Sequence, residues 1–461
     1  MTDSKTSSLA RVHDELLFLC AYPPTPLALR RAESRLRRFA KRMKGVDPFL
    51  DPEISGIAGT EVDVIFSYDF VSWLKRRFPR QVDIDWDEPP DPDRLAAVLT
   101  PLMPRLAEEV VDADAPYFEV LRARGLPWLL DHVDALAYDS LGLRIVWKFD
   151  ASHSRTLMRR KPRKIFYRRG PLLARRDVSI ERELAAPPMP ISRLSRAEGE
   201  RVLEIARTAL AMRYRELYNF TWGDPATIIS ADAGRGLEIV LIGLTRDRRL
   251  PLRAGFAPFV FRNGVPIGYG DAFGLCERME VSFNIFYGFR EGESAFAFAR
   301  LLKLYRQLFG STVFTIDPYQ IGHGNDEAID AGAFWFYRKL GFRSTDTKIE
   351  RMAVREEARI QKEPQHRTSK RMLKTMAQSP MAWGSRDWDR FRIHKVVDVI
   401  LSREDGEESG RGQSHRPDSS RSAALRMTTR LSPDLRRAKN GRTEQRYLRM
   451  LANNKEVRSA L

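Results

Sequence analysis

Hydrophobic and polar residues alternate over 280–286, which predicts a strand with one polar face and one buried face. After a short turn at 289–295, apolar residues recur every three or four positions over 295–309, the spacing of an amphipathic helix. A second strand is predicted over 313–316, and a helix rich in aromatic residues over 333–342.

The residues before this segment predict a largely antiparallel sheet. Asn263 and Gly264 separate two β-rich runs within 259–273, and this pair is the strongest short-range signal for a tight hairpin. Two further strands are predicted over 227–230 and 237–244, around a glycine-containing turn.

Two other helices have clear patterns. Ser195 is followed three residues later by Glu198, a capping pattern that predicts the start of a helix over 195–218. The segment 27–43 has apolar residues on one face and Arg or Lys on the other. This basic face is either a surface for an acidic partner or the solvated side of a helix packed on a core.

The patterns predict an α/β (α+β) fold, with a mixed, largely antiparallel sheet flanked by helices. A closing strand is predicted over 347–354, and helices over 356–378 and 388–401. The predicted parts are a mainly helical N-terminal domain over 1–150, a basic linker over 151–194, an α/β domain over 195–355, a helical extension over 356–403 and a basic, disordered tail over 404–461.

Composition narrows the classes of partner. The chain has 461 residues and a formal charge of +17, which favours nucleic acid, phosphorylated metabolites or anionic membrane surfaces. Its only cysteines, Cys20 and Cys276, have no metal-ligand spacing and predict no disulfide framework, as in a cytoplasmic protein. The apolar run 16–22 is too short to cross a bilayer, so no transmembrane segment is expected.

The most basic segment is 155–176, which has ten Lys or Arg and no Asp or Glu. Phe166 and Tyr167 lie in its middle, and basic and aromatic side chains together are typical of nucleic-acid contacts. The alternative is an interdomain connection whose charges are solvated or paired. The basic tail over 404–461 is either an arm that binds anions such as nucleic acid without specificity or a solvated tail.

The turn before the 295–309 helix is a candidate anion site. The start of a helix presents unpaired backbone N–H groups and the positive end of its dipole, and Ser294 is a plausible N-cap. A phosphate group fits such a position.

The order of hairpin, strand, phosphate-facing turn, helix, strand and aromatic helix resembles the GCN5-related N-acetyltransferase (GNAT) superfamily. In that family the strand before the turn splays away from the next parallel strand, and acyl-CoA lies in the gap. The family's later helix has a pattern such as Ala-x-x-x-Tyr-x-Lys-x-Gly-Phe. The matching residues here are Ala333, Tyr337, Lys339, Gly341 and Phe342.

The resemblance implies a set of cofactor-binding residues for acetyl-CoA or another acyl-CoA. Tyr337 would protonate the departing thiolate, and backbone groups of Ile285 and Phe286 would pair with the pantetheine. The residues implied to hold the pyrophosphate are Arg290, Glu291, Gly292, Glu293, Ser294 and Ala295. Glu293 departs from the family pattern, because it stands where a glycine is usual.

A general base must take a proton from the attacking amine, directly or through water. Glu280, on the polar face of the 280–286 strand, is the first candidate, and structural pairing with Arg278 is its alternative role. His323 is the second candidate. No metal is expected.

The resulting hypothesis is transfer of an acyl group, expected to be acetyl, from acyl-CoA to an amine on a small molecule or peptide. One alternative is a noncatalytic or repurposed GNAT-like binding protein whose basic regions contact nucleic acid. Another is aminoacyl transfer from a charged tRNA, which relatives of the same superfamily perform.

Overall fold

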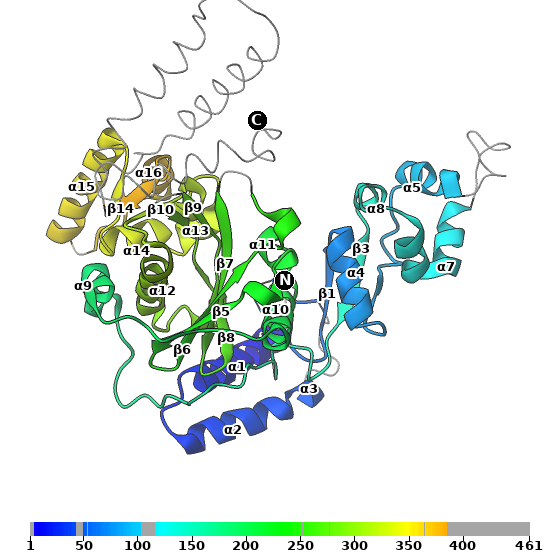
Figure 1. Cartoon of the computed structure of the whole chain (residues 1–461), viewed down its shortest axis with the longest axis horizontal. Helices are drawn as coiled ribbons and strands as arrows, with labels where there is room; N and C mark the ends of the chain where they lie inside the picture. The colour runs from blue at the N-terminus through cyan, green and yellow to red at the C-terminus, as the bar shows by residue number, and fades with distance from the viewer. Residues whose placement is uncertain are drawn as a thin grey trace, which may run out of the picture.

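The computed structural model describes residues 4–42, 49–52, 54–102, 116–250, 253–275, 277–363 and 365–384. Buried side chains in these ranges form a large core and a small one. The large core combines the first helices with residues from 180 onward, and the small core lies mainly within 62–149 (Figure 1).

A single mixed sheet organises the large core. Its main path of strands, in spatial order, is β13 (Arg343–Ser344), β14 (Met381–Trp383), β12 (Val313–Ile316), β10 (Arg278–Val281), β9 (Ala272–Leu275), β7 (Ala254–Arg262), β6 (Leu237–Gly243), β5 (Ile229–Gly234) and β4 (Ile191–Arg193). Two more strands, β8 (Val265–Tyr269) and β11 (Asn284–Ile285), pair with each other, and β8 also pairs with β7. Only β10 and β12 pair in parallel among these described strands.

The hairpin predicted over 259–273 is confirmed as β7 and β8. Asn263 and Gly264 have φ angles of 47° and 78°. Positive φ at both central residues matches the right-handed twist of the flanking strands, and asparagine and glycine accept it at low cost.

Helices cover both faces of the sheet (Figure 1). The rings of Phe220 and Phe259 lie 6.0 Å apart, where α11 (Tyr218–Thr221) meets β7. On α12 (Ser294–Phe309), Phe309 stacks on Phe256 of the same strand at 4.5 Å. Positions 256 and 259 differ by an odd number, so they point to opposite faces. Thus α12 covers one face and α11 the other, with α10 (Arg196–Ala211) beside α11.

The capping pattern at 195–198 is confirmed. The Ser195 hydroxyl accepts the Glu198 N–H, and the Glu198 carboxylate accepts the Ser195 N–H at 3.0 Å. The helix ends at Ala211, earlier than predicted.

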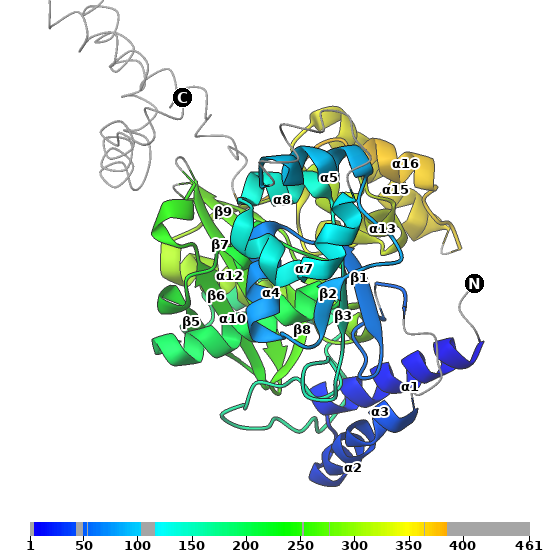
Figure 2. The same ribbon diagram turned by 90° about the vertical axis from the view of Figure 1, so that its right-hand side faces the viewer.

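The N-terminal helices α1 (Ser4–Ala21) and α2 (Pro26–Arg37) belong to the large core, so residues 1–150 do not form one helical domain. Figure 2 shows α2 lying along α1 beneath the sheet. Asn263 at the hairpin tip donates its amide to the carbonyl of Ala21 at 2.9 Å. Ala32 and Leu36 of α2 are buried, and the arginines of its outer face are exposed. Its amphipathic pattern is explained by packing on the core.

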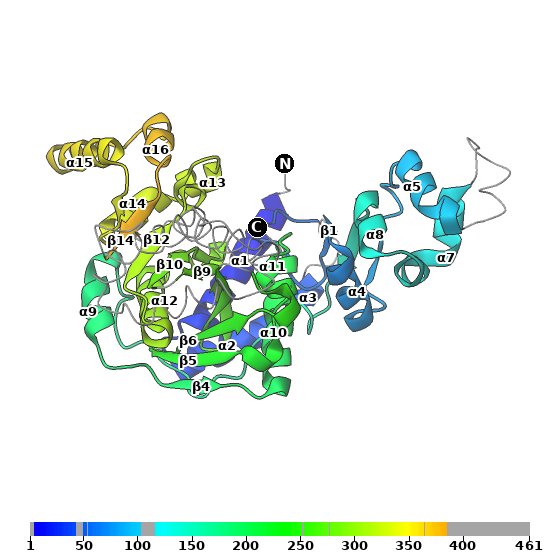
Figure 3. The same ribbon diagram turned by 45° about the horizontal axis from the view of Figure 1, so that its top comes forward.

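The small core has a sheet of its own, beside the main body (Figure 3). Its antiparallel strands, in spatial order, are β1 (Glu61–Ile65), β3 (Arg144–Lys148) and β2 (Val82–Ile84). Its helices are α4 (Tyr68–Arg77), α5 (Pro92–Leu99), α7 (Tyr117–His132) and α8 (Ala135–Leu141). Met212, at the end of α10, also packs into this core, so the two units are in contact.

The basic segment 155–176, the basic strap, is joined to the large core by ion pairs. Arg155 pairs with Asp14 at 2.8 Å, and Arg160 pairs with Glu238 at 2.9 Å. The strap leads to α9 (Ile180–Ala185) and then to β4 of the sheet. The predicted linker over 151–194 is therefore part of the folded body.

The C-terminal described residues differ in two elements from the sequence prediction, because the helix predicted over 356–378 is interrupted between Lys362 and Lys370. A strand was predicted over 347–354, but α15 (Thr347–Lys362) occupies it, with Asp346 accepting N–H groups at its start. The short helices α13 (Asp326–Asp330), α14 (Ala333–Lys339) and α16 (Lys370–Met376) pack nearby. The predicted helix over 388–401 and the tail over 404–461 lie outside the described residues. In the described part, no helix has the length and apolar character needed to span a membrane.

Candidate functional site

Strands β10 and β12 run side by side for only a short distance. Their parallel register extends from Arg278 opposite Val313 to Glu280 opposite Thr315. Beyond this point the chain continues as β11, which pairs with β8, whereas β12 stays beside β14. Of the described strands, only β8 pairs with β11. The other edge of β11 therefore faces the space between β11 and β12.

Gly270 allows β11 to separate from β12. At Gly270, between β8 and β9, an added Cβ would lie 2.1 Å from the carbonyl oxygen of Ser282. The Ser282 hydroxyl accepts the N–H of Asp271 at 2.8 Å, and the Ser282 N–H donates back to the Asp271 carbonyl at 2.8 Å. This close crossing interrupts the strand predicted over 280–286 and divides it into β10 and β11.

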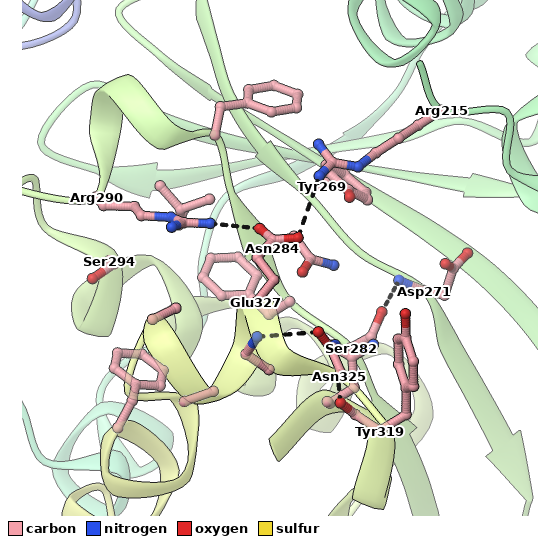
Figure 4. Close-up of a pocket in the computed structure, with 18 of the residues that line it drawn as sticks. Arg215, Tyr269, Asp271, Ser282, Asn284, Arg290, Ser294, Tyr319, Asn325 and Glu327 are labelled. Atoms are coloured by element: carbon pink, nitrogen blue, oxygen red, sulfur yellow. Dashed lines mark hydrogen bonds and ion pairs between the residues drawn. The ribbon is translucent and has the colours of Figure 1, made fainter. Parts of the chain in front are cut away.

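A pocket of about 570 Å³ occupies the space between the separating strands (Figure 4). One wall is the segment 282–286, and the wall opposite comes from α13 and α14. The turn before α12 contributes Arg290 and Ser294, and the connection between α10 and α11 contributes residues 214–217. The pocket therefore has one end at the start of α12 and another at the α10–α11 connection.

Tyr337 of α14, the residue expected to act as the acid, lines this pocket. Its ring is buried and makes edge contacts with Phe298 at 5.4 Å and Phe336 at 5.2 Å. Burial raises the pKa of its phenol well above the usual value. The hydroxyl is therefore protonated at neutral pH and is chemically able to donate a proton.

The side chain of Glu293 is turned away from the pocket. Its carboxylate is almost fully buried and pairs with Arg262 at 2.7 Å and with Arg235. The Leu173 N–H of the basic strap also donates to it, at 3.1 Å. Burial alone would raise its pKa, but these donors outweigh burial and lower it. Glu293 is thus a structural anion that adds no charge to the pocket lining.

The turn at 290–295 is only partly open to a ligand. The Glu293 N–H donates to the Tyr22 hydroxyl at 3.3 Å, and the Gly292 N–H donates to the Phe289 carbonyl at 2.9 Å. Glu291 is exposed, and Ala295 is buried beneath the turn. The predicted set of six pyrophosphate residues is reduced to the two that line the pocket, Arg290 and Ser294.

Ser294 is not the N-cap that was predicted. The N-cap position is Glu293, which makes no capping side-chain bond, and Ser294 is the first helical residue. Its N–H belongs to the first turn of α12, where amides have no partner within a helix.

An ion-pair network crosses the pocket (Figure 4). Arg290 donates to Glu327 of α13 at 2.8 Å, and Arg215 lies 3.8 Å from the other carboxylate oxygen of Glu327. These three residues come from three separate segments, and all line the pocket.

The two bases suggested by the sequence are not among the pocket's lining residues. The Glu280 carboxylate pairs with Arg253 at 3.1 Å and with Arg278 at 3.6 Å, the alternative role considered for it. His323 is exposed in the loop before α13.

Asp271, which sequence reasoning missed, does line the pocket. Its carboxylate accepts the Asn219 amide at 2.9 Å. Burial raises its pKa, against the opposing effect of this hydrogen bond. The available signal in the sequence was a lone acidic residue between two otherwise apolar β-rich runs.

In the described part of the chain, no group of three His, Cys, Asp or Glu side chains is placed to hold a metal ion. No family model, curated protein or solved structure matches the chain. The chemistry of the pocket is thus the basis for assigning a function.

Proposed function

We propose that this protein is a GNAT-like N-acyltransferase that moves an acyl group, expected to be acetyl, from acyl-CoA to an amine. The supporting observation is the pocket between the separating strands β11 and β12, with Tyr337 in its wall. In the family that the sequence resembles, acyl-CoA lies in a gap of this kind.

The backbone of β11 suits the pantetheine. The Phe286 N–H donates to the Ile267 carbonyl at 2.9 Å, toward β8. Because successive residues of a strand present their N–H and C=O groups to alternate sides, those of Ile285 face the pocket. We therefore assign the backbone contact with the pantetheine to Ile285. The Phe286 N–H cannot make this contact, because it already bonds to β8.

The start of α12 suits the pyrophosphate. The helix has 16 residues, so the partial positive charge at its N-terminus is well developed. Arg290 adds a guanidinium that can make a bidentate contact with phosphate oxygens. Ligand phosphates would compete with Glu327 for this side chain.

In the proposed reaction the neutral amine nitrogen attacks the thioester carbonyl carbon. A C–N bond forms, the C–S bond breaks, and the amine loses one proton. The departing thiolate takes a proton from the Tyr337 hydroxyl, and solvent restores that proton. The products are the N-acyl amine and free CoA.

The function is tested by calorimetric titration of the full chain with acetyl-CoA. We expect a dissociation constant below about 1 mM, which corresponds to roughly 4 kcal/mol of binding free energy. Ser294→Asp should weaken this binding by about tenfold or more, because its carboxylate would repel the pyrophosphate. A carboxylate at a helix N-terminus stabilises the helix, so this loss would not reflect unfolding.

The matched control is Ser369→Asp, at the N-cap of α16 outside the pocket. It should leave acetyl-CoA binding unchanged. Absence of binding to the unaltered chain at millimolar acetyl-CoA would refute the proposal.

Nucleic-acid binding is the second candidate, because Lys161, Arg163, Lys164 and Arg169 of the basic strap are exposed. Phe166 is not placed to stack on a base, since Arg235 and Arg262 lie over its ring at 5.1 and 5.5 Å. Binding through the strap should weaken with added salt and with alanine at these four positions. Insensitivity to both changes would exclude this surface.

A further inference from the structure

The part of the pocket beside the α10–α11 connection makes none of the acyl-CoA contacts proposed above. It is formed by residues 214–217, between the helices that cover the opposite face of the sheet from α12, and by Asp271. The pocket thus reaches from the donor side of the sheet, through the opening between the strands, to the other side. An acceptor entering at this second end would meet the thioester at the opening.

Asp271 is held firmly at this end. Its main chain is fixed by both hydrogen bonds to Ser282, and its side chain by the Asn219 amide. Asn219 is itself buried on α11. A carboxylate placed in this way can accept a proton from an amine without moving.

Arg215 of the α10–α11 connection supplies a positive charge to the pocket, and Glu327 lies between it and Arg290. Its guanidinium lies 6.0 Å from the centre of the Tyr269 ring and 3.8 Å from the Glu327 carboxylate. Glu327 comes from a five-residue helix and is 57% exposed. The Glu327 carboxylate therefore lies beside the Arg215 guanidinium, and both side chains line the pocket (Figure 4).

A carboxylate of a ligand could replace Glu327 beside Arg215 at little cost. The Glu327 side chain is more than half exposed and lies 3.8 Å from Arg215, so the pair between them is weak. A bound ligand excludes water and makes its own pair with Arg215 stronger. Replacement of Glu327 by a ligand carboxylate beside Arg215 therefore favours an acceptor that carries a negatively charged group.

We propose that the acceptor is a small, amino-acid-like amine that carries an anionic group, with Asp271 as the base for its amine and Arg215 as the receptor for its anion. This inference rests on the proposed acyl transfer and deepens it. The acceptor's ammonium group first loses a proton to solvent. As the C–N bond forms, the nitrogen's second proton passes to the Asp271 carboxylate, and the C–S bond breaks as described above.

The test measures CoA release with matched pairs of acceptors. Each pair is an L-amino acid and its decarboxylated amine, for example lysine and cadaverine, and aminoalkylphosphonates report whether phosphonate can replace carboxylate. We expect kcat/KM to be at least about tenfold higher for the anionic member, since its anionic group can pair with Arg215 and the decarboxylated amine has no such group. Arg215→Gln should remove this preference through KM, and Arg246→Gln, an exposed arginine outside the pocket, should preserve it.

Asp271→Asn should lower kcat by roughly 100-fold and remove the acidic limb of the pH profile, while acetyl-CoA binding is retained. Retained binding separates this inference from the proposed function, which fails only if acetyl-CoA does not bind. The inference is overturned if anionic amines are not turned over faster than their partners, or if Asp271→Asn keeps full turnover.

Discussion

At the scale of single residues, Tyr337 and Asp271 have complementary properties. Both line one pocket, and burial raises the pKa of each. A phenol with a raised pKa is protonated at neutral pH, and a carboxylate with a raised pKa is a stronger base than a solvated one. The two groups are therefore suited to opposite ends of the same reaction.

Replacing Tyr337 with phenylalanine tests the acid. The ring contacts with Phe298 and Phe336 remain, so the fold and acetyl-CoA binding should be retained, within about twofold in dissociation constant. Turnover should fall by roughly 100-fold, because a positioned general acid contributes about this factor. Steady-state kinetics with calorimetry separates the two effects.

The control for that substitution is Tyr305→Phe. Tyr305 is fully buried on α12, does not line the pocket, and its hydroxyl has no hydrogen-bond partner in the described structure. Its loss should not reduce turnover. Unchanged turnover in Tyr337→Phe would remove the acid assignment.

At the scale of elements, the turn before α12 depends on segments far away in the sequence. Arg235 follows β5, Arg262 ends β7, and Leu173 belongs to the basic strap, yet all three bind Glu293. Tyr22, at the end of α1, covers the same turn. The turn is therefore built on a buried charge network.

Glu293→Gln should destabilise the protein. Removing the carboxylate leaves the buried Arg262 without its counter-charge, which costs roughly 3–5 kcal/mol when a buried pair is broken. Urea unfolding of the variant measures this loss. Glu200→Gln is the control, because its pair with Arg196 is exposed and contributes less than about 1 kcal/mol. Equal stability of both variants would contradict the structural role of Glu293.

At the scale of the whole molecule, a buried polar cluster joins α1 to the basic strap and to the approach to β1. The His13 ring bonds the Thr156 hydroxyl at 2.9 Å, and that hydroxyl accepts the Ala58 N–H at 3.0 Å. Burial lowers the pKa of His13 to about 4. Asp14 next to it pairs with Arg155.

This cluster predicts a loss of global stability in mild acid. The unfolded chain binds a proton on His13 below about pH 6.5, and the folded chain does so only near pH 4. Stability is therefore fully present above pH 6.5 and declines as the pH falls to 4, by roughly 3 kcal/mol from this group. Burial alone would raise the pKa of Asp14, but Arg155 and His13 lower it, so Asp14 adds a further loss of stability only below about pH 4.

Urea midpoints measured between pH 7.5 and pH 4.5 test this prediction. His13→Asn should flatten the dependence on pH, and His323→Asn, at an exposed position, should leave it unchanged. The same pH dependence in His13→Asn and in the unaltered chain would contradict the prediction.

Local patterns in the sequence were sufficient for several elements. The Asn263-Gly264 hairpin, the start of the 196–211 helix and the strand over 313–316 were confirmed, because turn geometry, capping and short β-rich runs depend on neighbours in the sequence. The strand predicted over 347–354 was wrong. Asp346 caps a helix there, and Ala353 is the one buried residue of α15.

By itself the sequence determined the hairpin around Asn263 and Gly264, the helix over 295–309, the strand over 313–316 and the place of Tyr337 on its helix. Only the tertiary structure decided that Glu293 is neutralised by two arginines and that Asp271, rather than Glu280 or His323, lines the pocket. The physical reason is that elements are specified by local spacing, whereas charges are paired by packing between segments far apart in the chain.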